Sequence, residues 1–356
     1  MTILHVQKVS GISGSEAHLL SLLPLLRARG WDAQMLVLHE GEPGAAAFVD
    51  AMAGKGVPVT QLRLRADLDP LAFARLVARL IRRRPELLHT HLVHADLYGL
   101  TAGALARVPV RLSTKHGFNE FRAHRWLGVA DRAVGRLAHR QIAISRGLAE
   151  YLADVEGFDA DGFDVVHYGI AAGPEPTPYE GETPRLLAIG RLIPIKGFDV
   201  LLEAFAQARL QVPSLTLEIA GDGALRERLE AGAGDGVTFL GRVDPIGPAI
   251  ERAAVVVVPS RGEGFGMVAL EAMERGRAVI ASAVGGLPEL VVPGETGLLV
   301  PSESPDELAA AIVELCSDPG RVRALGLLGR VRALERFGEE RSVSSIETVY
   351  RAALAR

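Results

Sequence analysis

Short apolar runs alternate with longer segments of helical spacing along the whole chain. Residues 3–9 form an alternating, largely apolar run that is typical of a buried strand. Residues 17–29 carry six leucines at helical spacing and predict a helix that Gly30 ends. The same order of strand and helix then repeats, and such alternation favours a parallel sheet covered by helices. The predicted fold class is therefore α/β.

The repeating pattern predicts two α/β halves. Further strands are expected at residues 33–38, 87–89, 110–114, 141–144, 185–189, 215–220, 237–240, 254–258 and 278–281, and a further helix at residues 71–84. The pattern is interrupted between Gly169 and Pro184 by a segment rich in proline and glycine, which is typical of a linker. We therefore predict an N-terminal domain at 1–172, a linker at 173–183 and a C-terminal domain at 184–340. Residues 341–356 are predicted as a helix that is a candidate to pack back on the N-terminal domain.

Composition narrows the class of protein. The length of 356 residues fits two domains. A net charge of −4 excludes a nucleic-acid reader held by bulk positive charge, so no nucleic-acid partner is expected. The single cysteine, Cys316, excludes a disulfide framework and favours a reducing compartment. We see no signal peptide and no long apolar segment, and so predict a cytoplasmic protein, with the inner face of the membrane left open as a peripheral site.

The densest chemical signal follows the apolar run 255–258. Gly264 and Gly266 lie in a loop that leads into a helix, where the backbone can approach a ligand and free N–H groups point at it. Glu263 lies in this loop and Glu271 lies in the helix. An ionised carboxylate accepts two hydrogen bonds at once, so each can hold a pair of sugar hydroxyls. The alternative is a glycine turn with a capping acid.

A second signal follows the predicted strand 185–189. Residues 190–197 include Arg191 and Lys196, the latter being the only lysine in the second half. A guanidinium fork and a compact ammonium can together neutralise a diphosphate. The alternative is a solvated loop with two cations.

These motifs, in this order, resemble the family-4 retaining glycosyltransferases of the GT-B fold (glycosyl transferases group 1). The matching pieces are the E-x7-E pair Glu263 and Glu271 and the runs at 190–197, 220–223, 239–243, 285–289 and 294–300. The first half matches more weakly, at 11–16, 89–91, 115–117 and 168–169. The resemblance implies two Rossmann-like domains with a cleft between them.

The resemblance also assigns roles to residues of a bound nucleotide-diphosphate sugar. Arg191 and Lys196 would hold the diphosphate, Glu271 the ribose and Glu263 the transferred sugar. His116 matches the family histidine beside the reacting carbon. The remaining implied donor contacts are Gly14, Gly221, Arg242, Val243, Gly264, Phe265, Gly266 and Met267.

The implied reaction is metal-independent front-face transfer of a hexose-type sugar with retention, within glycan biosynthesis. A UDP-sugar is the favoured donor and a GDP-sugar the other candidate, and no cofactor is expected. The acceptor is left open between a small molecule, a glycan and a lipid-linked molecule. Two alternatives remain: a nucleotide-sugar epimerase of the same fold, and a sugar-nucleotide binder without catalysis.

Three weaker signals are also present. His89, His91 and His94 have a spacing that suits a metal, but we expect none, because cysteine and most acidic partners are missing nearby. The loop at Gly11 and Gly14 lacks a full dinucleotide motif, which disfavours a dehydrogenase. Arg75, Arg79, Arg82 and Arg83 are predicted on one helix face, opposite Leu76, Val77, Leu80 and Ile81. That basic face is either simply solvated or a peripheral contact with anionic lipid, and Arg122, His124, Arg125 and Trp126 add a second basic stretch.

Overall fold

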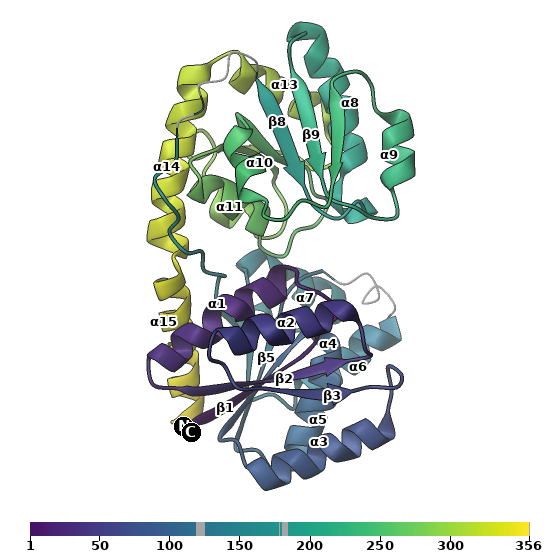
Figure 1. The fold of residues 1–356 in the computed structure, drawn as a ribbon, viewed down its shortest axis with the longest axis vertical. Helices are drawn as coiled ribbons and strands as arrows, with labels where there is room; N and C mark the ends of the chain where they lie inside the picture. The colour runs from purple at the N-terminus through teal and green to yellow at the C-terminus, as the bar shows by residue number, and fades with distance from the viewer. Residues whose placement is uncertain (119–124, 178, 180–183, 356) are drawn as a thin grey trace. The chain divides into compact units, whose positions relative to one another are not determined.

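The computed structural model describes residues 1–118, 125–177, 179 and 184–355. The chain forms two compact units, one of Met1–Gly169 with Glu339–Arg356 and the other of Ile170–Gly338. Each unit is built on its own parallel sheet (Figure 1). The unit boundaries lie three residues before the predicted linker and two residues before the predicted terminal helix.

The N-terminal unit contains a seven-stranded sheet in its described part, in the order β3-β2-β1-β4-β5-β6-β7. Its strands are β1 (Thr2–Lys8), β2 (Asp32–His39), β3 (Val59–Arg63), β4 (Leu87–His91), β5 (Val110–Lys115), β6 (Arg140–Ala143) and β7 (Phe163–Val165). Its helices are α1 (Gly14–Ala28), α2 (Pro43–Gly54), α3 (Pro70–Arg83), α4 (Leu92–Ala95), η1 (Asp96–Leu100, a π-helix), α5 (Thr101–Leu105), α6 (Arg125–Gly135), α7 (Arg146–Glu156), η3 (Ala160–Gly162) and α15 (Glu339–Leu354). Because β1 lies centrally and the order reverses between β1 and β4, the unit has the topology of a doubly wound sheet.

Alternation along the strands builds two apolar cores on this sheet. Ile3 faces one core, with side chains from α1, α2 and α15, whereas Leu4 faces the other, with side chains from α3 and α5. Successive side chains on a strand point to opposite faces, so one apolar strand supplies both cores. The unit is therefore a three-layer arrangement of helix, sheet and helix.

Helix α15 completes the first of these cores, although it is the last element of the chain. Val343, Ile346 and Tyr350 are buried on it among side chains from the sheet and from α1. Polar contacts add to this packing: Trp31 donates its indole N–H to Glu347, and Arg29 forms an ion pair with the same carboxylate.

The C-terminal unit contains a six-stranded sheet in its described part, in the order β10-β9-β8-β11-β12-β13. Its strands are β8 (Arg185–Ile189), β9 (Thr216–Ala220), β10 (Val237–Gly241), β11 (Val255–Val258), β12 (Ala278–Ser282) and β13 (Leu298–Val300). Its helices are η4 (Pro194–Lys196, a 3-10 turn), α8 (Phe198–Gln211), α9 (Arg226–Gly232), α10 (Gly247–Arg252), α11 (Met267–Glu274), α12 (Leu287–Leu290), α13 (Pro305–Cys316) and α14 (Pro319–Phe337). Here the order reverses between β8 and β11.

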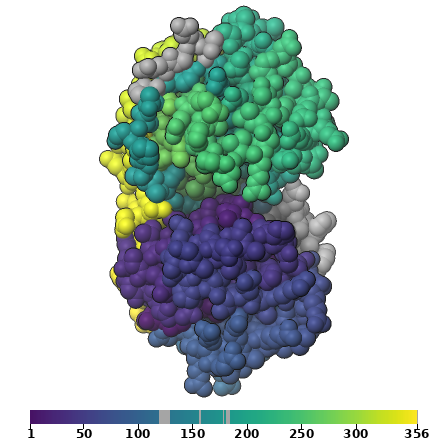
Figure 2. Space-filling view, in the orientation of Figure 1, coloured from purple at the N-terminus to yellow at the C-terminus, as the bar shows by residue number. Residues whose placement is uncertain are grey.

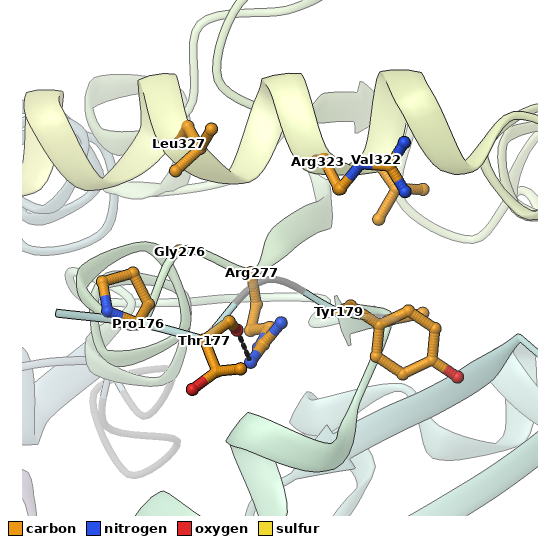
Figure 3. A pocket seen from close by; sticks show the side chains of 9 residues that line it. Pro176, Thr177, Tyr179, Gly276, Arg277, Val322, Arg323 and Leu327 are labelled. Atoms are coloured by element: carbon orange, nitrogen blue, oxygen red, sulfur yellow. Dashed lines mark hydrogen bonds between the residues drawn. The ribbon is translucent and has the colours of Figure 1, made fainter. Parts of the chain in front are cut away.

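The described part of the predicted linker packs against the C-terminal unit. Glu274 accepts a hydrogen bond from the Gly173 N–H and pairs with Arg330 of α14, and both side chains are buried. Arg277 donates to the Thr177 carbonyl at 2.7 Å (Figure 3). Two buried arginines thus hold this extended segment through its backbone carbonyls, because it has no regular ladder of its own.

Candidate donor site

The most distinctive chemistry in the C-terminal unit lies where its strand order reverses. The loop after β8 carries Arg191 and Lys196, and the loop after β11 carries Glu263. Strands β8 and β11 are neighbours, so both loops leave the same carboxyl edge of the sheet. Open α/β sheets bind ligands at this point, because the two loops diverge to opposite faces.

Lys196 and Glu263 form an ion pair at this edge. The Lys196 Nζ lies 2.6 Å from Glu263 Oε2, with 22% and 16% of the two side chains exposed. Ser260 donates to the same carboxylate oxygen at 3.3 Å. The pair brings two of the predicted site residues together, whereas the role of Ser260 was not predicted from the sequence.

Glycine backbones hold these loops together. Gly197 has φ +65°, and a Cβ there would lie 2.1 Å from the Pro259 carbonyl oxygen of the β11 loop. Gly221 has φ +145°, and its Cβ would lie 1.8 Å from the Gly190 oxygen. Only glycine combines these backbone angles with such close approaches. Gly221 therefore serves loop packing, while its predicted donor contact stays a prediction.

Helix α11 starts directly after the glycine loop. Gly266 at its N-cap has φ +107°, and the Leu287 side chain of α12 packs where its Cβ would be. Gly286 approaches the backbone of Gly264 and Phe265, so the motif at 285–289 supports this loop from behind. The N–H groups of the first turn, from Met267 onwards, have no earlier helical carbonyls to bond and are available to a ligand.

Glu271 lies one helical turn into α11 and is half-buried. Burial raises the pKa of its carboxyl above the ordinary value, against the opposing effect of Arg275. Within the described residues, no hydrogen bond reaches its carboxylate oxygens. A half-buried carboxylate without a partner is suited to receive hydroxyl hydrogens from a ligand.

The remaining predicted donor residues of this unit lie at the same edge. Arg191 is exposed in the β8 loop, and Arg242 and Val243 follow β10, the first exposed and the second half-buried. The Gly221 N–H donates to the Gly241 carbonyl, which joins the loop after β9 to the end of β10. The sheet topology thus gathers these residues along one edge of the C-terminal unit.

Two predicted residues, Gly14 and His116, belong to the N-terminal unit. Gly14 begins α1, after Ser13 at the N-cap, whose backbone N–H donates to Glu16 at 3.1 Å. His116 follows β5, and both of its ring nitrogens have partners: Nδ1 the Tyr168 hydroxyl and Nε2 the ring of His91. Burial, with Lys115 and His18 nearby, holds the pKa of His116 well below its usual value.

The three histidines whose spacing suits a metal do not lie together in the structure. His94 is exposed and lies 3.1 Å from Asp67, whereas His89 and His91 are buried beside His5 of β1. One ring nitrogen from each of His5, His89 and His91 lies within 4.8 Å of the other two. The sequence did not predict that His5 belongs to this group, although His5 and His89 pair across β1 and β4.

On the opposite face of the same sheet, Lys115 is fully buried in an ion-pair cluster. Its Nζ lies 2.8 Å from Asp96 and 3.1 Å from Asp131. Asp96 also accepts hydrogen bonds from Thr90 and Ser113. The ion pairs of Lys115 were not predicted from the sequence, because its partners come from η1 and α6.

A cavity of about 120 Å³ lies elsewhere in the C-terminal unit, with Pro176, Thr177 and Tyr179 on one side and α14 on the other (Figure 3). Its lining includes Ala254 and Arg277, which precede β11 and β12. It therefore lies at the amino edge of the sheet, and none of the predicted donor residues lines it.

The apolar side of α3, opposite the arginines, is only partly buried. Leu76 and Leu80 are buried, but Ile81 is 53% exposed, next to Arg82. At 100° per residue Ile81 still lies on the side of α3 away from Arg75 and Arg79, so that apolar side is buried only in part. Helix α3 lies at the surface of its unit (Figure 2). Of the second basic stretch, Arg122 and His124 lie outside the described residues, as do the side chains of Arg125 and Trp126.

Within the described residues, none of the helices has the length and apolar character needed to span a bilayer.

Comparisons with known proteins cover both units. The profile described as "Glycosyl transferase 4-like domain" matches residues 13–169, and "Glycosyl transferases group 1" matches residues 183–318. The D-inositol 3-phosphate glycosyltransferase of Rhodococcus jostii is 32% identical over 325 residues, which cover 80% of this chain and 72% of that protein.

Other relatives match over shorter segments. A D-inositol 3-phosphate glycosyltransferase of Segniliparus rotundus is 38% identical over 179 residues, covering 47% of this chain and 39% of that protein. A Mycobacterium tuberculosis GDP-mannose-dependent alpha-(1-6)-phosphatidylinositol monomannoside mannosyltransferase is 38% identical over 164 residues, covering 42% and 43%. The chain spans less than half of the length of the first curated relatives that it matches.

Among solved structures, Anabaena Alr3699/HepE in complex with UDP and glucose superposes with a TM-score of 0.83 at 22% identity. The match covers 99% of this chain and 100% of that one. Together with the two parallel sheets, it confirms the predicted fold class of two Rossmann-like domains.

Proposed function

Because the chain belongs to the family-4 glycosyltransferases of the GT-B fold, we propose that it transfers a hexose-type sugar from a nucleoside diphosphate donor. The transfer proceeds with retention at the anomeric carbon, to a small-molecule, glycan or lipid-linked acceptor. The observation that carries the proposal is the Lys196–Glu263 pair at the switch point of the C-terminal sheet, together with Glu271 of α11, whose carboxylate has no hydrogen-bond partner within the described residues.

Each group in this arrangement has a chemical task. The Lys196 ammonium and the Arg191 guanidinium neutralise the diphosphate as it leaves, helped by the N–H groups at the start of α11. Glu263, anchored by Ser260 and Lys196, receives hydroxyls of the transferred sugar. Glu271 receives the ribose hydroxyls, because its carboxylate is half-buried and has no protein partner within the described residues.

The proposed front-face reaction needs no metal for the leaving group. The two cations and the helix N-terminus together take over the charge of the diphosphate, and the acceptor hydroxyl passes its proton to that leaving group. His116 and Gly14 are assigned to the sugar and the phosphates through their match to the family motifs. This assignment rests on the resemblance, since both residues belong to the other unit.

The donor base is proposed as uracil or guanine. The relative from Mycobacterium tuberculosis is named as dependent on GDP-mannose, and Alr3699/HepE was solved with UDP and glucose. Both bases are therefore tested side by side. The relatives' names put inositol phosphate and phosphatidylinositol mannosides among the acceptors to try.

A thermal-shift screen against UDP, GDP, UDP-glucose and GDP-mannose tests donor binding first, because a ligand that binds the folded state raises the midpoint. Failure of all four to raise it contradicts the proposal. Product analysis then separates the alternatives: an epimerase changes the donor without an acceptor product, and a binder shows affinity without turnover.

The decisive variant is Lys196→Ala. We expect release of the nucleoside diphosphate to fall by roughly 10²–10³ because one preorganised cation is lost. Lys55→Ala is the matched control, since Lys55 is exposed at the end of α2 in the other unit. Unchanged turnover in a folded Lys196→Ala protein would exclude the proposed role.

We also propose a peripheral contact with anionic lipid through α3. Arg75, Arg82 and Arg83 are exposed on this helix, and the side chains of Leu71 and Ile81 on the same helix are exposed as well. Basic and apolar side chains on one surface helix are the combination that binds charged membrane interfaces.

Flotation with vesicles tests this contact. We expect binding to phosphatidylcholine vesicles that contain phosphatidylglycerol and none to phosphatidylcholine alone. Arg82→Glu should weaken it, and Arg228→Glu on the exposed surface of α9 should not. Equal flotation with both vesicle types, or none, excludes the contact.

A further inference from the structure

Four histidines of the N-terminal unit form one hydrogen-bonded array across the central strands. His5 lies on β1, His89 and His91 on β4, and His116 directly after β5. β1, β4 and β5 are neighbours in the sheet, and the first three rings lie on the face that α15 covers. His5, His89 and His91 are at most 1% exposed.

The hydrogen bonds of the array run in one line. His116 Nδ1 contacts the Tyr168 hydroxyl at 2.5 Å, and its Nε2 contacts His91 Nδ1 at 2.9 Å. His91 Nε2 then contacts His5 Nδ1 at 2.9 Å, and His5 Nε2 contacts the Tyr350 hydroxyl at 3.3 Å.

From Tyr350 the line continues to the last ring. The same hydroxyl contacts His89 Nδ1 at 2.8 Å, and His89 Nε2 contacts the Thr114 hydroxyl at 2.7 Å. All eight ring nitrogens of the four histidines therefore have a polar partner within the described residues.

The rings are neutral, because burial disfavours the imidazolium. It lowers the pKa of His5 to about 3 and holds the pKa values of His89, His91 and His116 well below the ordinary value. A neutral imidazole has one donor nitrogen and one acceptor nitrogen. A line of such rings is satisfied only when all donate in the same direction.

Two states meet this condition. In one, all four rings carry the proton on Nε2, and donation runs from Tyr168 to Thr114. In the other, all four carry it on Nδ1, and donation runs from Thr114 to Tyr168. A mixed state among His116, His91 and His5 sets two N–H groups, or two lone pairs, against each other in a buried site. A mixed state across Tyr350 leaves either its hydroxyl hydrogen or one ring nitrogen without a partner, because one hydroxyl has a single hydrogen to donate. Both are costly.

A bound metal is the competing explanation of the same cluster. The spacing within 4.8 Å would allow one at His5, His89 and His91. However, each ring nitrogen of these residues already has a partner of matching polarity, and an ion would have to break these contacts. The hydrogen-bond pattern is complete without it.

We propose that the array acts as a single tautomeric unit and that Tyr350 of α15 is a positioning residue for His116. This proposal rests on the proposed function, in which His116 contacts the donor sugar. A sugar hydroxyl that replaces Tyr168 at His116 Nδ1 meets an acceptor in the Nε2–H state and a donor in the Nδ1–H state. The contacts of Tyr350 with His5 and His89 therefore determine whether His116 Nδ1 offers the sugar hydroxyl a hydrogen-bond donor or an acceptor.

Removal of the Tyr350 hydroxyl gives a sharp expectation. In Tyr350→Phe, His5 Nε2 and His89 Nδ1 both lose their partner, and a buried acceptor without a partner is less costly than a buried N–H. His5, His91 and His116 should therefore carry the proton on Nδ1, and His89 on Nε2. In the unaltered protein His89 and His116 share one tautomer, whereas in the variant they have opposite ones.

Nitrogen-15 NMR of the full chain, labelled at histidine, measures this directly through the shifts of Nδ1 and Nε2. Single His→Gln variants assign the signals. Tyr98→Phe is the matched control, because Tyr98 is a buried tyrosine whose hydroxyl bonds Asp69 and Asp67 outside the array. It should leave all four tautomers unchanged.

Mixed tautomers in the unaltered protein, or the same tautomer at His89 and His116 in Tyr350→Phe, would overturn the proposal. So would a metal found in stoichiometric amount in the purified protein together with loss of the matching ring N–H signals. The NMR result does not depend on turnover, so failure of the array and failure of the transferase proposal are separate outcomes.

Discussion

Glu271 shows how burial prepares a single side chain for a ligand. The pKa of its carboxyl is raised by desolvation, so it takes up a proton at a higher pH than an exposed glutamate does. Only the ionised form accepts two hydroxyl hydrogens. Affinity for a nucleotide should therefore fall as the pH drops toward and through this raised pKa, and it should be fully present above it.

We expect Glu271→Gln to weaken binding of UDP or GDP by about ten- to a hundredfold, since hydrogen bonds to a charged acceptor are lost. The variant should also lose the fall in affinity at low pH. Calorimetric titration across the pH range measures both effects. Glu203→Gln, at an exposed position of α8, is the control, and equal affinities in the two variants would contradict the role.

Gly197 links backbone conformation to the Lys196–Glu263 pair. Gly197→Ala meets both an unfavourable φ and the Pro259 oxygen, whereas Gly294→Ala meets only an unfavourable φ of +77°, with nothing near its Cβ. We expect Gly197→Ala to lower the free energy of unfolding by more than the roughly 1 kcal/mol of the control. It should also weaken nucleotide binding, since it pushes the β8 and β11 loops apart. Urea unfolding and calorimetry measure this, and equal effects of both variants would refute it.

At the scale of elements, the buried Lys115 cluster joins β5, η1 and α6. Lys115→Met removes a cation from between two buried carboxylates, and we expect the free energy of unfolding to fall by about 3–5 kcal/mol. Chemical denaturation measures the change, with Lys55→Met as the exposed control. A loss below about 1 kcal/mol would show that the carboxylates are relieved in another way.

The elements themselves were largely predictable where apolar runs are buried on both sides. β8 has the bounds predicted for it, and β1, β2, β9 and β11 differ by a residue or two. β3 was not predicted because it is an edge strand, half-buried, with Gln61 in its centre. The three-residue strands β7 and β13 are too short for a period-two pattern to appear.

The candidate site was predictable in its residues and only partly in its contacts. Motif order placed Lys196 and Glu263 at the ends of two strands, and the strand order then explains why they meet. The contact of Tyr350 with His5 and His89 had no signal in the sequence, because 345 and 261 residues separate the partners. Local spacing predicts neighbours on one element and not partners across a sheet.

At the scale of the whole molecule, the histidines are unevenly distributed along the chain: all ten lie at or before His167. The pKa values of His5 and His18 are lowered from 6.5 to about 3 in the folded protein, mainly by burial. The unfolded chain therefore binds more protons than the folded chain between these values. Their contribution to stability is present above pH 6.5 and is lost as the pH falls toward 3.

We expect acid to unfold the N-terminal unit first. Each such histidine contributes a slope of about 1.4 kcal/mol per pH unit within that window. Both tryptophans of the chain, Trp31 and Trp126, lie in this unit, so their fluorescence reports on it alone. Calorimetry reports on both units. Loss of the C-terminal transition at a higher pH than the fluorescence change would contradict this expectation.

The position of α15 also has a consequence for how the protein is made. The N-terminal unit is discontinuous in sequence, because residues 170–338 are inserted before Glu339–Arg356. On the ribosome, the second unit is complete while the first still lacks the helix that covers Ile3 and Leu23. The usual order of domain folding during synthesis is from the N-terminus onwards. Here the sheet face that carries Ile3 stays uncovered until α15 has been translated after residues 170–338, so its apolar surface is exposed for the time that their synthesis takes.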